Sequence, residues 1–267
     1  MAINPILAPS TRTRFRATSN RRETDGKQRA RQGKSEYFRI FGNRRRCGEC
    51  VAPGGQSRRE EFMHVAVIGK GNVGKALAPN MAAAGHSVVY GVRDPRDPKY
   101  ASDDGVPLKT VRDAVSDAEI VVLAINWAAV DNVLADCGDL GGKILVDCIN
   151  PYDFRNNLAP LVAPDQSAAK IIAGKTTAKV VKAFNQVGAA VMAQARNRKA
   201  KPLQFVAADD KDARAKVIQL SKEIGFDARD AGGLEYAREL EGMARLWIAQ
   251  AFGHGMPPAA AWLLTAE

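Results

Sequence analysis

Short apolar runs recur along the chain from residue 65 onward, and most of them end in glycine, asparagine or another turn-forming residue. A continuous run rich in β-branched residues is typical of a strand that is buried on both faces of a parallel sheet. The pattern therefore predicts a series of buried strands. We expect them at residues 65–68, 88–93, 119–125, 142–148, 180–184, 203–207 and 227–230.

Helical patterns separate these predicted strands. An alanine-rich segment runs from Lys75 to Gly85, a glycine suited to a helix end, although Pro79 within it removes one backbone hydrogen bond. Strands that alternate with helices indicate an α/β fold with a doubly wound, mostly parallel sheet, completed here by a small helical or α+β element at the C-terminal end. Further helices are expected at residues 128–135, 211–224 and 234–252.

A glycine-rich turn, G-x-G-x-x-G, follows the first predicted strand. Its first glycine permits a tight turn, its second lets backbone N–H groups approach a pyrophosphate, and its third lets the next helix pack close to the strand. The helix N-terminus adds free donors and a partial positive charge. A strand before the turn and a helix after it indicate a Rossmann dinucleotide site, and the alternative is a plain βα turn. The expected cofactor-binding residues are Gly69, Lys70, Gly71, Asn72, Val73 and Gly74.

The second predicted strand ends at Arg93 rather than at an acidic residue. A site selective for NAD usually has Asp or Glu here, which accepts hydrogen bonds from the ribose hydroxyls. A carboxylate would repel a 2′-phosphate, whereas a guanidinium binds it through a forked, charge-assisted pair. Arg96 lies close enough in sequence to assist. The sequence therefore favours NADP over NAD, and the alternative is an ordinary exposed loop of arginine and aspartate.

Four more side chains follow the carboxyl ends of predicted strands, where open α/β sheets bind their ligands. Asn126 and Trp127 follow one strand, and Asn150 and Asn185 follow two others. Their carboxamides are suited to hold a nicotinamide and its ribose by hydrogen bonds, with the indole as a wall of the acceptor site. The alternative for each asparagine is a turn former, and for Trp127 a core residue at a helix start.

Charge is distributed unevenly along the chain. The net charge of +10 is concentrated in residues 1–62, which hold 15 Lys or Arg and 6 Asp or Glu, and this segment has no hydrophobic periodicity. It is expected to be a disordered basic extension, and we weigh three explanations: a tail that contacts nucleic acid or membrane, a transit peptide, and a misassigned start. We favour a start at Met63 or a tail without function. Nucleic acid is not an expected partner of the nearly neutral remainder.

The cysteines do not indicate a metal site. Cys47 and Cys50 form a single C-x-x-C pair without a second pair or a nearby pair of histidines. Cys137 and Cys148 are expected to be ordinary thiols in a reducing cytoplasm. The chain also has no apolar run of the roughly 18 residues needed to span a membrane. We therefore expect a cytoplasmic protein without a metal.

A general acid is not evident beside the glycine motif. His64 and His86 flank strand starts, and Lys182 is placed within a strand near an edge or end of the sheet. A hydroxy-acid dehydrogenase needs a group that moves the hydroxyl proton. Hydride passage between a nicotinamide and a flavin-like ring depends mainly on orientation and on exclusion of water. The sequence favours this second chemistry, without an assigned catalytic residue.

Several of these segments together resemble the coenzyme F420-dependent NADP oxidoreductase family. The resemblance covers about residues 63–265 and none of residues 1–62. It implies phosphate contacts from the glycine loop and a 2′-phosphate site at Arg93 and Arg96. The segments that carry it are 67–74, 91–95, 124–127, 146–151, 180–185, 224–227, 230–234 and 237–241.

Two positions depart from that family's pattern. Val92 stands where the family has a serine that contacts the 2′-phosphate, and Asn126 stands where it has a proline beside the nicotinamide. The second departure concerns the other substrate rather than NADP. The resemblance also implies that Ile125, next to this position, contacts the cofactor. Deazaflavin, flavin, quinone and ferric acceptors all stay open.

The sequence thus predicts an NADPH-binding oxidoreductase that transfers a hydride between NADP(H) and a deazaflavin- or flavin-like acceptor. The expected organisation is an extension at 1–62, an NADP-binding domain at 63–175, and a part at 176–267 that completes the sheet and the acceptor pocket. We expect a homodimer. The alternatives are a regulatory module that binds NADPH without turnover, and an imine or β-hydroxyacid reductase, which would need a positioned proton donor.

Overall fold

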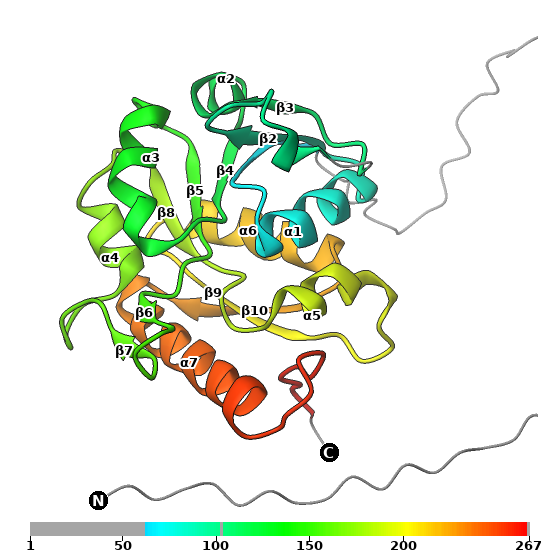
Figure 1. The fold of residues 1–267 in the computed structure, drawn as a ribbon, viewed down its shortest axis with the longest axis vertical. Helices are drawn as coiled ribbons and strands as arrows, with labels where there is room; N and C mark the ends of the chain where they lie inside the picture. Colours follow the sequence, from blue (N-terminus) through cyan, green and yellow to red (C-terminus); the bar gives the residue numbers. More distant parts are fainter. Residues whose placement is uncertain (1–61, 102–103, 266–267) are drawn as a thin grey trace, which may run out of the picture. The chain divides into compact units, whose positions relative to one another are not determined.

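A mostly parallel sheet forms the centre of the structure (Figure 1). The computed structural model describes residues 62–101 and 104–265. In this part of the chain the sheet has eight strands in the order β10-β9-β8-β5-β4-β1-β2-β3. They are β1 (His64–Ile68), β2 (Ser87–Val92), β3 (Leu108–Thr110), β4 (Ile120–Leu123), β5 (Ile144–Asp147), β8 (Lys179–Lys182), β9 (Leu203–Ala207) and β10 (Asp227–Gly232).

Strand direction changes once across the sheet. Along the sheet, the neighbouring strands β3, β2, β1, β4, β5 and β8 all run parallel to one another. β9 pairs antiparallel with β8 through Lys182 and Ala207, and β10 runs parallel to β9. The expected doubly wound, mostly parallel fold is therefore confirmed, with β9 and β10 as a reversed pair at one edge.

Helices cover both faces of the sheet, and each face has its own apolar core (Figure 1). One core includes residues of α1, α5 and α6, and the other includes residues of α2, α3, α4 and the start of α7. β4 supplies alternate residues to the two cores, as expected for a strand buried on both sides. The helices are α1 (Asn72–Ala83), α2 (Val111–Ser116), α3 (Val130–Cys137), α4 (Ala168–Ala173), α5 (Ala189–Gln194), α6 (Lys211–Glu223) and α7 (Ala237–Gly253).

The sequence pattern missed several short elements. These are too short for their periodicity to stand out, and they include a small antiparallel hairpin between β5 and α4. The helix expected at 128–135 is a 3₁₀ turn followed by α3. The missed elements are β3, α2, α4, α5, the hairpin strands β6 (Tyr152–Asp153) and β7 (Ala159–Pro160), and the 3₁₀ turns η1 (Pro98–Tyr100) and η3 (Ala195–Asn197). The 3₁₀ turns η2 (Trp127–Ala129) and η4 (Leu234–Tyr236) open the helices expected at 128–135 and 234–252.

Pro79 lies inside α1, as the sequence shows, and the helix continues through it. The neighbouring Asn80 side chain donates to the carbonyl of Ala76 at 2.9 Å and to that of Met192 at 3.0 Å. Because Met192 belongs to α5, this amide connects the two helices.

The described residues, 62–101 and 104–265, all belong to one compact unit. Strands from both 63–175 and 176–267 belong to the same sheet, and the boundaries predicted between them stay predictions. The extension at 1–62, except Phe62, and its pair Cys47 and Cys50 lie outside the described residues. Within the described ranges, no helix combines the length and apolarity that crossing a membrane requires.

Candidate functional site

The glycine loop between β1 and α1 is shaped by two close backbone approaches. Gly69 has a φ of +101°, which favours glycine, and its N–H donates to the carbonyl of Gly91 at 2.9 Å. A Cβ atom on Gly69 would lie 2.5 Å from the carbonyl oxygen of Ala124. A Cβ atom on Gly74 would lie 2.0 Å from the carbonyl oxygen of Gly69. Both positions therefore require glycine for the fold itself.

Gly71 differs from these two glycines. Its φ is −80°, and a Cβ atom built on it would meet no atom within 4 Å. It is the N-cap residue of α1, so no side chain caps the helix, and the first turn holds no acidic residue. The first N–H groups of a helix have no intrahelical acceptor, and together with the helix dipole they attract an anion. The space above Gly71 therefore suits a phosphate.

Alanine at these two positions is expected to separate folding from binding. Gly71→Ala should leave the melting temperature within about 2 °C of wild type, because the backbone is compatible and the space is empty. It should weaken NADPH binding by about tenfold or more, since a methyl group then occupies the phosphate position. Gly74→Ala should instead lower the melting temperature. Thermal unfolding and NADPH titration of both variants check this. An unchanged NADPH affinity in Gly71→Ala would show that the phosphate does not bind at this loop.

Lys70, expected to bind the cofactor, has its side chain turned into the protein. Its ammonium lies 3.7 Å from the carboxylate of Asp104 and 4.5 Å from the centre of the Tyr90 ring. The Tyr90 hydroxyl donates to the same carboxylate at 3.1 Å, and burial and Asp104 raise the pKa of this tyrosine. The backbone of Lys70, rather than its ammonium, is thus the part suited to a pyrophosphate. Its role in cofactor binding stays a prediction.

Arg93 follows directly after β2, and its side chain is exposed. Within the described residues it forms no ion pair. Arg96 is also exposed, and its Nε lies 3.3 Å from a carboxylate oxygen of Asp94. Hydrogen bonds from Arg96 lower the pKa of Asp94. Arg93 is therefore the more available of the two predicted 2′-phosphate ligands.

Asn150 and Asn185 meet at the ends of β5 and β8. The Asn185 amide donates to the Asn150 side-chain oxygen at 3.1 Å, and the Asn150 amide donates to the Asn185 carbonyl at 2.9 Å. Asn185 uses its other amide hydrogen on the carbonyl of Leu240, and its side-chain oxygen accepts from Gln186. Phe184, with a φ of +57°, makes the sharp turn that directs the chain into this arrangement.

The hydrogen bonds divide the roles of these two asparagines. Asn185 is buried, both of its amide hydrogens are used by protein acceptors, and its side-chain oxygen accepts from Gln186. Within the described residues, Asn150 keeps one N–H and one lone pair, because it makes one bond of each kind. Asn150 can therefore bind a ligand, while Asn185 holds it in position.

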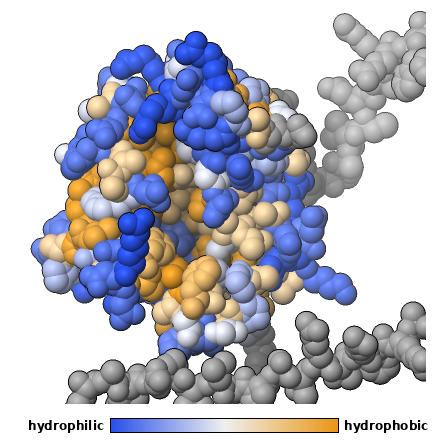
Figure 2. All heavy atoms as spheres, viewed as in Figure 1, coloured by the Kyte–Doolittle hydropathy of each residue, from blue (hydrophilic) through white to orange (hydrophobic). Residues whose placement is uncertain are grey.

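A cavity of about 610 Å³ joins this pair to the glycine loop. Figure 2 shows a hollow at the centre of this face of the molecule, with apolar side chains along the rim over α7. The cavity lies between the first turn of α1, the ends of β5 and β8, α5 and the end of α7. Its lining residues include Asn72, Val73, Lys75, Ala76, Asn150, Phe154, Asn185, Val187, Gly188, Trp247, Ile248 and Phe252.

Asn126 and Trp127 are not among the residues that line this cavity. Asn126 is exposed at the start of η2, and Trp127 packs against the core that includes α2 and α3. This position matches the alternative that we considered for the tryptophan. Ile125 lies closer to the loop, because its Cγ2 would be 3.1 Å from a Cβ atom on Gly69. The structure therefore brings together two of the three predicted asparagines, and the binding roles of all four residues stay predictions.

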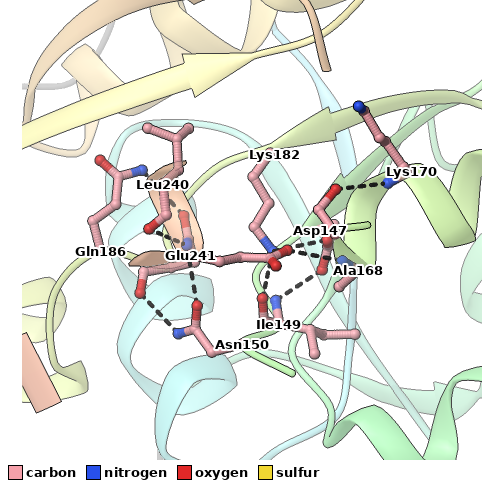
Figure 3. A network of polar contacts seen from close by, with 11 residues as sticks. Asp147, Ile149, Asn150, Ala168, Lys170, Lys182, Gln186, Leu240 and Glu241 are labelled. Carbon is pink, nitrogen blue, oxygen red and sulfur yellow. Dashed lines mark hydrogen bonds and ion pairs between the residues drawn. The ribbon is translucent and has the colours of Figure 1, made fainter. Parts of the chain in front are cut away.

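A buried ionic group lies next to Asn150 (Figure 3). The Lys182 ammonium is 2.9 Å from a carboxylate oxygen of Asp147 and 2.8 Å from one of Glu241, and it donates to the carbonyl of Ile149. All three ionic side chains are at most 2% exposed. Glu241 also accepts from the N–H of Ala168 at 3.0 Å, and Asp147 accepts from that of Ile149 at 2.8 Å.

This group fixes both segments that flank the asparagines. Burial raises the pKa of Glu241, whereas for Lys182 the effect of burial is outweighed by Asp147 and Glu241, which raise its pKa. Ile149 precedes Asn150, and Glu241 follows Leu240, the residue that accepts from Asn185. Lys182, expected within a strand near an edge or end of the sheet, is instead the last residue of β8, which is an interior strand of the sheet.

Comparison with known proteins gives consistent matches. A family described as "NADP oxidoreductase coenzyme F420-dependent" matches residues 64–151. The F420-dependent NADP reductase of Methanothermobacter thermautotrophicus is 30% identical over 209 residues, which cover 70% of this chain and 88% of that protein. A crystal structure of a candidate F420-dependent NADP reductase from Arthrobacter superposes with a TM-score of 0.65 at 33% identity, covering 73% of this chain and 96% of the other.

The metalloreductases are a second group of relatives. Rat metalloreductase STEAP3 is 30% identical over 183 residues, or 68% of this chain. The chain spans 36% of the length of that protein and 41% of human metalloreductase STEAP2. Because the reductase from Methanothermobacter is matched over most of its length, the assignment rests on that relative and on the superposed structure. The chain belongs to the F420-dependent NADP oxidoreductase family.

Proposed function

We propose that this protein transfers a hydride between NADP(H) and a flat electron acceptor of the flavin or deazaflavin type. The observation that carries the proposal is that the first turn of α1 and the Asn150–Asn185 pair line the same cavity, of about 610 Å³. Phosphates at the glycine loop and a nicotinamide at Asn150 would then lie at two ends of one binding site. Ligands of open α/β sheets bind at this carboxyl edge of the strands.

The residues present fit NADP(H). The uncapped first turn of α1 supplies N–H donors for the pyrophosphate, and the exposed Arg93 supplies a guanidinium for the 2′-phosphate. Asn150 has the free donor and acceptor that a carboxamide requires. Bound NADPH supplies the hydride, and this chain orients the nicotinamide.

The cavity walls fit a conjugated acceptor better than a hydroxy acid. Lys75 is the one ionisable side chain among the lining residues named above, and it is exposed. A carbonyl or imine substrate needs a placed proton donor, whereas a flavin-like ring takes a hydride without one from the protein. Aromatic and aliphatic walls from Phe154, Trp247 and Ile248 suit a flat ring and exclude water.

An acceptor screen with the full chain tests the proposal. NADPH oxidation is followed at 340 nm under anaerobic conditions. The acceptors are 5-deazariboflavin, FMN and ferric citrate, and an imine and a β-keto acid represent the alternative reductases. We expect turnover with the ring acceptors. NADPH binding without oxidation by any acceptor would favour a regulatory module, and turnover with the imine or the β-keto acid alone would favour a reductase of that class. Ferric citrate is included because relatives are named metalloreductases.

Replacement of Asn150 by leucine is expected to lower kcat with the ring acceptors by about tenfold or more. Loss of the hydrogen bonds to the carboxamide leaves the nicotinamide less well oriented, and each such bond contributes about 0.5–1.5 kcal/mol. Asn132→Leu on the exposed surface of α3 is the matched control and should change kcat by less than about twofold. Steady-state kinetics of both variants decide the matter, and equal kcat values for them would exclude Asn150 from the site.

A further inference from the structure

A second cavity, of about 570 Å³, lies on the outer side of α7. Its other wall is the segment that contains the β6–β7 hairpin and the loop after it. None of its lining residues lines the first cavity. Its volume is within the usual range for small-molecule sites, about 300–1,000 Å³. Its walls are mainly apolar, from Pro151, Leu158, Pro160, Val162, Ala163, Pro164, Leu246 and Ala249.

Two arginines of α7 line this cavity. Arg238 and Arg245 are seven residues apart, so they lie two helical turns and roughly 10 Å apart along the same face. In the described ranges of the chain, neither forms an ion pair. The Arg245 guanidinium lies 5.8 Å from the centre of the Tyr152 ring, on the opposite wall. Arg245 therefore reaches across the cavity rather than away from it.

The charge at Tyr152 supports this placement. Burial and Glu241 raise the pKa of its hydroxyl, and Arg245, Lys182 and Arg238 oppose that rise. Both arginines therefore act electrostatically on the Tyr152 hydroxyl at the opposite wall. Among the lining residues, the two guanidinium groups stand against the one carboxylate of Glu241, which shares Lys182 with Asp147. The net charge of the cavity wall is therefore positive.

Gly242 leaves the floor of the cavity bare between the two arginines. A Cβ atom built on it would meet no atom within 4 Å. Glycine in the middle of a helix lowers its stability by roughly 1 kcal/mol relative to alanine, so its presence needs another reason. An open floor flanked by two cations supplies one.

We propose that this cavity binds a small amphipathic anion, a carboxylate or phosphate monoester with an apolar body. The forked guanidinium groups match either anion in two-bond geometry, and the proline- and leucine-lined wall takes the apolar part. Two sources share this chemistry. The anion is either a separate small molecule or the acidic end of the electron acceptor, since Asn150 and Phe154 line the first cavity and Pro151 and Tyr152 the second.

A binding titration tests the site without catalysis. The probe is the amphipathic anion 8-anilinonaphthalene-1-sulfonate, added to the full chain with saturating NADP⁺ so that the dinucleotide site is occupied. Arg238→Gln/Arg245→Gln should weaken its binding by about tenfold or more. Arg112→Gln/Arg196→Gln removes the same charge elsewhere and should change it by less than twofold.

Gly242→Leu provides a second variant that keeps both arginines. Leucine would fill the floor, and because it favours the helix, the variant should be at least as stable as wild type. It should also weaken probe binding by about tenfold or more. Equal affinities in both double variants, or an unchanged affinity in Gly242→Leu, would overturn the site. So would a wild-type dimer that becomes monomeric in Gly242→Leu, since a second copy of the chain would then cover this surface.

Steady-state kinetics distinguish whether the anion is part of the electron acceptor or a separate molecule. This experiment rests on the proposed function. FMN and riboflavin share a ring system and differ in the phosphate. If the anion belongs to the acceptor, Gly242→Leu raises KM for FMN about tenfold and leaves that for riboflavin unchanged. If it is a separate molecule, both KM values stay unchanged while probe binding is lost. Failure of the proposed function would abolish both rates in the wild type and leave the titration intact.

Discussion

Replacement of Arg93 by alanine is expected to weaken NADPH binding by about 10- to 100-fold and NADH binding by less than about threefold. The two dinucleotides differ in the 2′-phosphate, so a residue that binds this group affects one and not the other. Arg93 is exposed directly after β2, and in the described part of the chain no carboxylate neutralises it. A charged hydrogen-bonded pair contributes about 1.5–3 kcal/mol, which sets the size of the effect.

Titration of nicotinamide fluorescence measures both dissociation constants directly and needs no acceptor. Arg112→Ala on α2 is the matched control and should leave both constants unchanged. Arg96→Ala should have a smaller effect than Arg93→Ala, because Asp94 already lies 3.3 Å from Arg96. Equal losses for NADPH and NADH in Arg93→Ala would refute the 2′-phosphate assignment.

Replacement of Lys182 by methionine is expected to destabilise the fold by about 3–5 kcal/mol, because two buried carboxylates lose their cation. For a chain of this size the melting temperature should fall by about 6–20 °C. Lys179→Met is a matched control on the same strand. Its partner is Asp210 at 2.9 Å, and both side chains are partly exposed, so the loss should stay below about 1 kcal/mol.

The pH dependence of the Lys182→Met effect has a definite sign. The folded-state pKa of Glu241 is raised by burial, and Lys182 limits that rise. Without the ammonium the pKa rises further. A carboxyl with a raised folded pKa contributes stability at low pH, which is lost as pH rises through that pKa. The stability difference between wild type and variant should therefore narrow toward pH 5 and widen toward pH 8. Denaturant unfolding at both pH values measures it, and a constant difference would contradict the buried ionic account.

The parts of the fold that follow from local patterns were predicted well. β1, the glycine loop and β9 occur at or within one residue of their expected positions, because their signals are contiguous in the sequence. The sequence could not predict whether β9 runs parallel or antiparallel to β8, because the apolar pattern of a buried strand is compatible with either direction. The antiparallel pairing of Lys182 with Ala207 shows the reversal only in the structure.

The candidate site was predicted less completely, for a similar reason. Sequence spacing correctly located Asn126, Asn150 and Asn185 at strand ends. It could not predict the direction in which the chain leaves each strand. After β4 the chain enters η2 and packs Trp127 on the α2–α3 core, so Asn126 is exposed away from the cavity lining. The partners of Lys182 were also invisible, because Asp147 and Glu241 are distant in sequence and meet it only through the sheet and α7.

In the proposed reaction a hydride passes directly from NADPH to a ring acceptor in the cavity between the glycine loop and Asn150. Single turnover of the full chain with C4-deuterated NADPH and 5-deazariboflavin tests it, because a hydrogen placed on the carbon of the deazaflavin ring does not exchange with water. With NADPH labelled on one or the other face of the nicotinamide, mass spectrometry should find deuterium in the reduced deazaflavin for one of the two labelled forms. Reduction without deuterium in the product, or no reduction while NADPH binds, would contradict the account.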